Sequence, residues 1–261
     1  MSASVRAIAR RAMVLAAAGT LALGSLPASA AATVDELVEL NLRAWNEEPE
    51  LLSEVYAPEG VHTATFYDRT NEYTGPEEID LVAGSGGIEL VGPRIDIPAA
   101  DGEWRWAGFA SLGGGTACLF HAVDGQLLRH DCVLPEHSFD SRNPVGLADP
   151  AASAEIDTIE QRLLESWAAG TTVERLAEVY APDAVHSARY LNRTQTHTGP
   201  EEIIRVAGHG PDRIGQRVDF EAPAGELAWA SVADVAGGSV CIFRAVDGMV
   251  TRHDCVLPIP G

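Results

Sequence analysis

Lysine is absent from this chain of 261 residues, and basic residues of any kind are few. Eighteen arginines stand against 38 aspartates and glutamates, which gives a net charge of −20. Nucleic-acid binding needs a basic face that displaces counterions from phosphates, and docking on anionic lipid needs basic clusters. The charge therefore argues against both partners, and we expect no nucleic acid and no membrane for the mature form.

The first 30 residues contain no acidic residue. They combine Arg6, Arg10 and Arg11 with an apolar run over 12–26 and the small residues Ala28 and Ala30. This pattern predicts a secretory signal peptide over 1–30, read by the general or the twin-arginine export route. The alternative is a membrane anchor, for which the apolar run is short. We therefore expect a secreted, extracellular protein.

Long stretches of unique sequence are also lacking, because the chain contains an internal duplication. More than half of the aligned positions after Glu54 are identical between two copies, which predicts two domains of one kind. The expected organisation is a signal peptide over 1–30, domain 1 over 31–135, a linker over 136–151 and domain 2 over 152–261. The strongest matches pair Glu54–Pro58 with Glu178–Pro182, Thr74–Ile79 with Thr198–Ile203, and Arg129–Pro135 with Arg252–Pro258.

Hydrophobic spacing in each copy predicts helices first and a sheet afterwards. The spacing is helical over Val34–Glu48 and over its counterpart Ile156–Ala169. Asp124-Gly125 favours a hairpin between the last two strands. The expected class is α+β, with helices gathered on one face of a curved, mostly antiparallel sheet. The remaining elements expected in copy 1 are helices over 51–56 and 76–83 and strands over 61–67, 94–97, 103–112, 116–123 and 126–134.

Only four cysteines are present, and they flank the two hairpin turns. Cys118 and Cys132 surround Asp124-Gly125, and Cys241 and Cys255 surround the equivalent turn. Residues directly opposite on adjacent strands lie within disulfide range. In an exported protein this predicts one structural disulfide per domain. Metal-binding or catalytic thiols and bridges between the domains are the alternatives that the sequence leaves open.

Three motifs of copy 2 resemble the SnoaL-like branch of the nuclear transport factor 2-like superfamily. They are Trp167–Gly170, Val179–His186 and Thr198–Ile203. The resemblance implies two cone-shaped, cystatin-like domains, each with a pocket between its helices and its sheet. Family members often pair through the open sheet face, so it also implies that the two domains pack on each other as a pseudo-dimer. This fold hosts many reactions as well as non-enzymatic modules, so the resemblance does not name a function.

The resemblance also implies which face lines the pocket. Isomerases of the family place a catalytic aspartate at the position of Ala188, and alternation puts His186 and Tyr190 on the same face. Their oxyanion-hole residues align with Leu163 and Cys241, so the isomerase groups are missing here. The predicted lining residues are Trp45, Tyr56, Ala64 and Phe66 in copy 1 and Trp167, Tyr180, Ala188 and Tyr190 in copy 2.

Each predicted pocket then holds two histidines, His62 with His130 and His186 with His253. As general acids or bases they would serve a dehydratase-, cyclase- or isomerase-type enzyme. Alternatively they pair with each other or with the backbone and fill the core. Two histidines are too few for zinc, so we expect no metal and no cofactor.

Arg69 and Arg193 recur at a strand end, where they either contact an anionic ligand or fix the following turn, and the turn is favoured. The first hypothesis for the protein is a non-enzymatic module that binds a small apolar molecule. The enzyme using a histidine pair is the second hypothesis. A module that binds another protein through the open sheet faces is the third.

Overall fold

The computed structural model of the chain describes residues 33–67, 69–83, 89–134, 145–191, 193–235 and 237–258. The predicted signal peptide and the 136–144 part of the predicted linker lie outside the described residues. We call the copy over 31–135 repeat 1 and the copy over 152–261 repeat 2. No helix among the described residues is long and apolar enough to cross a membrane.

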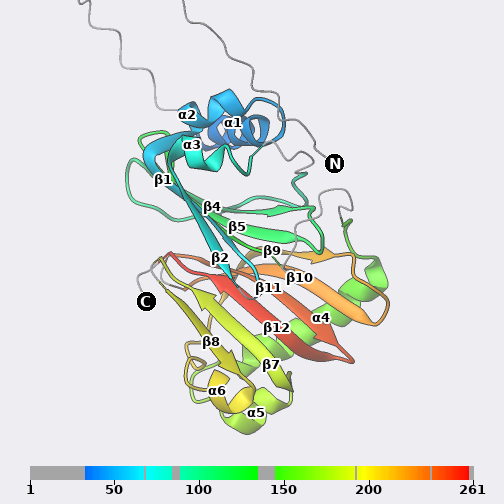
Figure 1. Cartoon of the computed structure of the whole chain (residues 1–261). Helices are drawn as coiled ribbons and strands as arrows, with labels where there is room; N and C mark the ends of the chain where they lie inside the picture. The colour runs from blue at the N-terminus through cyan, green and yellow to red at the C-terminus, as the bar shows by residue number, and fades with distance from the viewer. Residues whose placement is uncertain are drawn as a thin grey trace, which may run out of the picture. The chain divides into compact units, whose positions relative to one another are not determined.

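Repeat 1 forms one six-stranded sheet with four short helical segments gathered together in Figure 1. The strand order is β2-β1-β6-β5-β4-β3, and only β1 and β6 run parallel. The helical segments are α1 (Val34–Asn46), η1 (Pro49–Leu51), α2 (Leu52–Val55) and α3 (Gly75–Ile79). The strands are β1 (Tyr56–Thr65), β2 (Thr70–Thr74), β3 (Ile95–Ile97), β4 (Glu103–Ala110), β5 (Thr116–Val123) and β6 (Gln126–Val133).

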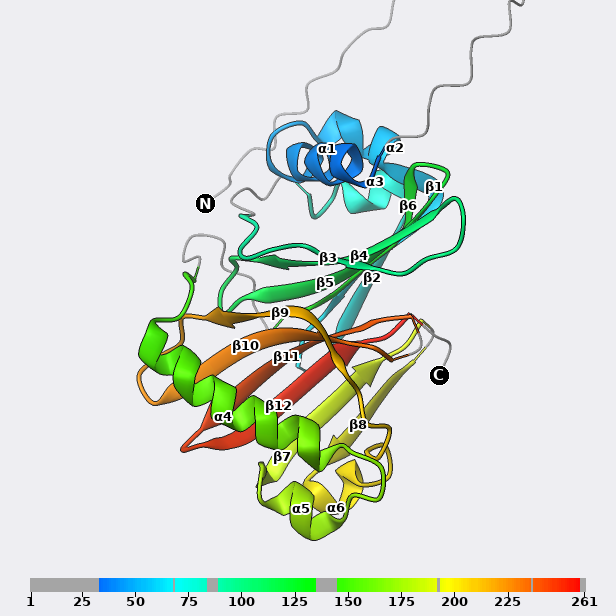
Figure 2. The same cartoon turned by 180° about the vertical axis from the view of Figure 1, so that it is seen from behind.

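Repeat 2 reproduces this topology, with the order β8-β7-β12-β11-β10-β9. In Figure 2, α4 crosses one face of the sheet, and α5 and α6 lie near β7 and β8. The helices are α4 (Pro150–Ser166), α5 (Val173–Ala177) and α6 (Pro200–Ile203). The strands are β7 (Tyr180–Arg189), β8 (Thr194–Thr198), β9 (Arg213–Phe220), β10 (Glu226–Ala233), β11 (Ser239–Val246) and β12 (Met249–Val256). The expected α+β class is confirmed in both repeats.

The first helix of each repeat starts at a polar cap. Thr33 and Glu36 form a reciprocal capping box at α1. Asp149 caps α4 by accepting from the backbone N–H of Ala152, and Pro150 fills the first helical position. Helix α4 therefore begins six residues before the predicted Ile156, inside the segment predicted as linker.

Strand β1 also begins earlier than predicted, at Tyr56 rather than at Val61. The strand contains Pro58, which cannot donate to a ladder, and its register against β6 shifts between Tyr56 and Val61. An irregularity of this kind tolerates proline within a strand. Strands β2 and β8, which are polar strands at the sheet edge, were not predicted from the sequence.

Each repeat has a hydrophobic core between its helices and its sheet. In repeat 1, Trp106 is buried and stacks on Phe120, with ring centroids 5.0 Å apart. In repeat 2, Trp229 stacks on Phe243 at 5.1 Å. These aromatic pairs form the wall of the sheet that faces the helices.

The cysteines are bonded in the predicted pairing, Cys118 with Cys132 and Cys241 with Cys255. Each pair lies directly across the ladder between the last two strands, with Cα atoms 4.1 Å apart. Both turns place an aspartate in the left-handed region, Asp124 at φ 52° and Asp247 at φ 51°, followed by a glycine.

Replacing both Cys118 and Cys132 by alanine should lower the free energy of unfolding by about 3 kcal/mol, because the open hairpin gains chain entropy in the unfolded state. Urea denaturation of the variant measures this loss. The equivalent variant of Cys241 and Cys255 is the matched control and should lose a similar amount. An unchanged midpoint for either variant would contradict the structural role of that bridge.

Candidate functional site

Each repeat encloses a cavity between its helices and its sheet. The first cavity, in repeat 1, has a volume of about 450 Å³, and the second, in repeat 2, has about 380 Å³. These volumes fall in the range of small-molecule sites. Of the predicted residues, Trp45, His62, Ala64, Phe66, Arg69 and His130 line the first cavity. Trp167, His186, Ala188, Tyr190 and His253 line the second.

Two residues of the predicted lining are placed differently. Tyr56 and Tyr180 are fully buried next to His130 and His253, and they are not part of the cavity lining. Arg193 is not a lining residue of the second cavity, and its guanidinium lies 5.7 Å from the ring centroid of Tyr190. Arg69 lies 5.0 Å over Phe66 in the same way.

The two histidines of each cavity are neighbours in the parallel ladder. His62 pairs with His130 between β1 and β6, with ring centroids 4.5 Å apart. His186 pairs with His253 between β7 and β12, with ring centroids 4.4 Å apart. The indole of Trp45 meets both rings of the first pair edge-on, and that of Trp167 does so for the second.

Hydrogen bonds determine which nitrogen of His62 carries the proton. Its Nδ1 lies 2.9 Å from the carbonyl oxygen of His130. A carbonyl only accepts, so Nδ1 must donate, and Nε2 is left as an acceptor. Among the described residues this Nε2 has no hydrogen-bond partner. His186 repeats the arrangement, with its Nδ1 3.0 Å from the carbonyl oxygen of His253.

Tyr56 connects His130 to helix α1. The Nδ1 of His130 lies 2.6 Å from the hydroxyl oxygen of Tyr56, which accepts from the indole N–H of Trp45 at 2.9 Å and donates to the Oδ1 of Asn41 at 3.4 Å. The Nε2 of His130 lies 3.2 Å from the Sγ of Cys132, a sulfur of the disulfide. These contacts hold the His130 ring in place.

Burial keeps all four imidazoles neutral. It lowers the pKa of His62 and of His186 to about 4. Burial, followed by the neighbouring histidine, lowers the pKa of His130 and of His253 well below the usual range. At neutral pH each cavity therefore presents an uncharged acceptor and no imidazolium.

The histidine pairs have part of the donor set of a metal centre. Nitrogen atoms of His62 and His130 and the Sγ of Cys132 lie within 4.8 Å of one another, and repeat 2 contains the equivalent group. The sulfur belongs to a disulfide in each case and is not a thiolate. Only the two imidazoles remain as ordinary ligands, fewer than a zinc site requires.

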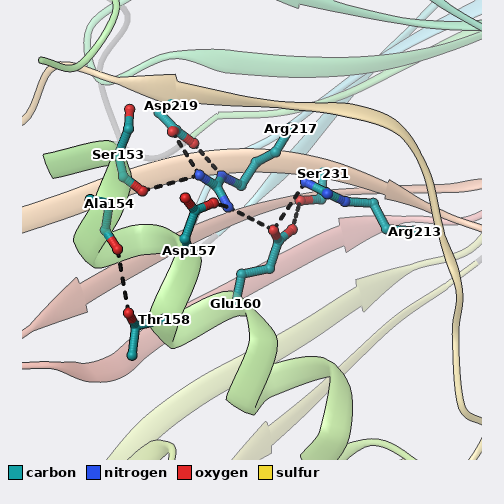
Figure 3. Close-up of polar contacts among 9 residues, drawn as sticks. All are labelled: Ser153, Ala154, Asp157, Thr158, Glu160, Arg213, Arg217, Asp219 and Ser231. Atoms are coloured by element: carbon teal, nitrogen blue, oxygen red, sulfur yellow. Dashed lines mark hydrogen bonds and ion pairs between the residues drawn. The ribbon is translucent and has the colours of Figure 1, made fainter. Parts of the chain in front are cut away.

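The second cavity contains a buried carboxylate that was not predicted from the sequence. Glu160 of α4 is 4% exposed, accepts from the hydroxyl of Ser231, and pairs with Arg217 at 2.8 Å and with Arg213 at 3.2 Å. Figure 3 shows the two arginines reaching Glu160 from β9, and Ser231 from β10. Glu160, Arg213 and Ser231 line the cavity, whereas Arg217 does not.

A signal for this cluster exists in the sequence, as a break in the duplication. When the paired tryptophans Trp45 and Trp167 are aligned, Glu160 corresponds to Val38. In the same alignment of repeats, Ser231 corresponds to Gly108, and Arg213 corresponds to Leu90. Comparing the copies for differences as well as for identities would have indicated the site.

No family model and no curated protein matches the chain. Solved structures with a similar fold include NTF-2-like proteins of unknown function from Silicibacter pomeroyi DSS-3 and from Burkholderia xenovorans LB400. The first is 10% identical, with a TM-score of 0.33, over 40% of this chain and 94% of that chain. The second is 13% identical, with a TM-score of 0.30, over 42% and 88%.

A member of the SnoaL-like family from Agrobacterium tumefaciens str. C58 also matches. It is 14% identical, with a TM-score of 0.25, over 40% of this chain and 97% of that chain. Each match covers about the length of one repeat. At these identities the likeness concerns the fold alone.

Proposed function

We propose that the protein is a binding module in which each cavity holds one small, mostly apolar molecule. The ligand donates a hydrogen bond to the Nε2 of His62 in repeat 1 or of His186 in repeat 2. The observation that carries this proposal is the oriented, unprotonated Nε2 in a cavity lined mostly by aromatic, aliphatic and disulfide groups. A pocket with few convergent polar groups is typical of small-ligand sites.

The low pKa of the cavity histidines favours binding over acid–base catalysis. A general base works best when its pKa lies near the operating pH. With a pKa of about 4, His62 and His186 are good hydrogen-bond acceptors and weak bases at neutral pH. The dehydratase-, cyclase- or isomerase-type enzyme is therefore the weaker proposal.

The test uses 2-naphthol, an apolar ring system with one hydroxyl donor, and naphthalene, which lacks the donor. Calorimetric titration of the mature chain should give two 2-naphthol sites. His62→Leu and His186→Leu should each weaken one site about two- to tenfold, the value of one hydrogen bond. Naphthalene binding should change little in either variant.

His121→Leu is the matched control, because His121 lies outside both cavities and is partly exposed. It should leave 2-naphthol binding unchanged. Absence of 2-naphthol binding to the wild-type protein would contradict the module itself. 2-Naphthol binding that is unchanged in both His62→Leu and His186→Leu would contradict the proposed hydrogen bond to Nε2.

We also propose that each repeat is a domain and that the two pack through their outer sheet faces as a pseudo-dimer. One cluster of buried apolar side chains supports this, since it draws on both repeats. Packing of this kind would use the face that the third hypothesis assigns to a protein partner. The cluster includes Ile95, Phe109 and Leu119 of repeat 1 and Val218, Phe220 and Ile242 of repeat 2.

We propose further that residues 1–30 direct export, so that the mature protein works outside the cell. The two disulfides support an oxidising compartment. A high negative charge keeps an exported protein soluble through mutual repulsion.

A further inference from the structure

The two cavities differ most at their rims. In the first cavity the rim includes Leu81, whose exposed fraction is 78%, and Leu90, with 37%. Exposed leucines beside an apolar cavity add to the surface that an apolar ligand can cover. The corresponding residues of repeat 2 are Arg205 and Arg213, and both line the second cavity. At these two positions the rim is apolar in repeat 1 and basic in repeat 2.

The alignment of these positions is supported by the residues around them. Leu81 and Arg205 are each followed by the same Val-Ala-Gly segment. Leu90 and Arg213 are each followed, four and six residues later, by an arginine and an aspartate, which are Arg94 with Asp96 and Arg217 with Asp219. The substitutions thus occur within matched structure and are not shifts of the chain.

Arg205 is available to a ligand. Its side chain is exposed at the rim, and among the described residues it has no ion pair or hydrogen bond. His209, also exposed, lines the same cavity. Arg213 makes one ion pair, at 3.2 Å to Glu160, so most of its five N–H donors are unused.

The negative charge of Glu160 does not neutralise both Arg205 and Arg213. Its carboxylate is already bound by Arg217 at 2.8 Å and by the hydroxyl of Ser231. Arg217 lies outside the cavity lining and also pairs with Asp157 and Asp219, neither of which lines the cavity. Besides the neutral His186 and His253, the ionisable groups that line the second cavity are therefore Glu160, Arg205, Arg213 and His209, and among the described residues the side chain of Arg205 makes no ion pair with Glu160.

Both repeats keep an arginine at the turn between their first two strands, Arg69 and Arg193. Each lies over an aromatic ring that lines its cavity, Phe66 or Tyr190. Arg69 also lines the first cavity, whereas Arg193 does not line the second. The inferred difference therefore rests on the two residues at the Leu81 and Leu90 positions, where the second cavity has two arginines and the first has none.

We infer that the cavities have diverged in ligand class: the second takes an amphipathic acid, and the first takes a neutral apolar molecule. In the second cavity the apolar body of the ligand lies against the aromatic wall and presents its hydrogen-bond donor to His186, and its carboxylate meets the guanidinium groups of Arg205 and Arg213. Arginine is suited to this role because its planar donors match a carboxylate. This inference rests on the proposed binding function and assigns a ligand chemistry to each site.

The experiment compares 2-naphthoate with 2-naphthol on the full mature chain at about pH 7.5, where a carboxyl group is ionised. Titration should give two sites for 2-naphthol and one for 2-naphthoate. Raising the salt concentration should weaken 2-naphthoate binding and leave 2-naphthol binding unchanged, because only the former depends on charge.

A reciprocal pair of variants assigns the site. Arg205→Leu places the residue of repeat 1 in repeat 2, and should weaken 2-naphthoate about five- to tenfold while changing 2-naphthol less than about twofold. Leu81→Arg makes the opposite exchange and should create a second 2-naphthoate site. Both side chains are exposed, so neither change disturbs a core.

The outcomes separate this inference from the proposed function. Two equal 2-naphthoate sites in the wild type, or one site that Arg205→Leu leaves intact, would overturn the divergence and keep the binding module. Two 2-naphthol sites with no 2-naphthoate site would also overturn it. Failure of both probes to bind would overturn the module together with the inference.

Discussion

Replacing Arg217 by leucine should lower the free energy of unfolding by about 3–5 kcal/mol. The side chain of Arg217 is 7% exposed, and it holds Glu160 at 2.8 Å together with both carboxylate oxygens of Asp219 (Figure 3). The side chains of Glu160 and Asp219 are only 6% and 12% exposed. Without the guanidinium, two poorly hydrated carboxylates lose their main counter-charge, and that desolvation is the source of the loss.

Arg94 is the matched control, because it occupies the equivalent position of repeat 1. It pairs with Asp35 and Asp96, whose side chains are 81% and 58% exposed. Water can replace the guanidinium there, so Arg94→Leu should cost less than about 1 kcal/mol. Urea denaturation of both variants measures the difference. Equal losses would mean that the burial of Glu160 adds nothing to the stability that Arg217 supplies.

Local rules were enough to predict the hairpins from sequence. Strand β5 has the predicted bounds, and β6 ends one residue before the predicted end. Asp124-Gly125 favours a tight turn by itself, and the turn determines which residues face each other across the ladder. The cysteine pairing follows from the same register, so it could be predicted without knowledge of the tertiary fold.

Elements that depend on distant partners were placed less well. The edge strand β2 (Thr70–Thr74) has a polar sequence, and it forms because β1 offers it unpaired backbone groups. The early start of β1 requires the backbone of Leu127 as a partner for Tyr56. Neither partner can be found from the local sequence pattern, because both lie on other strands.

The candidate site also contains residues that could be predicted from the local sequence and one that could not. Alternation along a strand predicts that His62, Ala64 and Phe66 share one face of the sheet, and all three line the first cavity. The functional role of the histidines stays a prediction. Glu160 could not be predicted by alternation or helical spacing, because its partners come from β9 and β10 after the packing of α4 against the sheet.

Acidification should destabilise the fold between about pH 6.5 and pH 4. An unfolded histidine has a pKa of about 6.5, whereas burial lowers the pKa of His62 and of His186 to about 4 in the folded state. Between these pH values the histidines bind protons in the unfolded chain but stay unprotonated in the folded chain. The contribution of these histidines to the free energy of unfolding therefore has its full value above about pH 6.5, and it falls as the pH is lowered toward 4.

The loss should be about 3 kcal/mol for each of these two histidines, and His130 and His253 add to it because their pKa values are also lowered by burial. Asp254 acts in the opposite sense, since burial raises its pKa, and it offsets part of the loss. Urea denaturation at intervals from about pH 7.5 to pH 4 measures the slope. His62→Leu and His186→Leu should each make the slope shallower, and His121→Leu, at a half-buried site, should change it less. A stability that stays flat across this window would mean that the imidazoles are hydrated in the folded protein, and the oriented neutral acceptor on which ligand binding depends would then be absent.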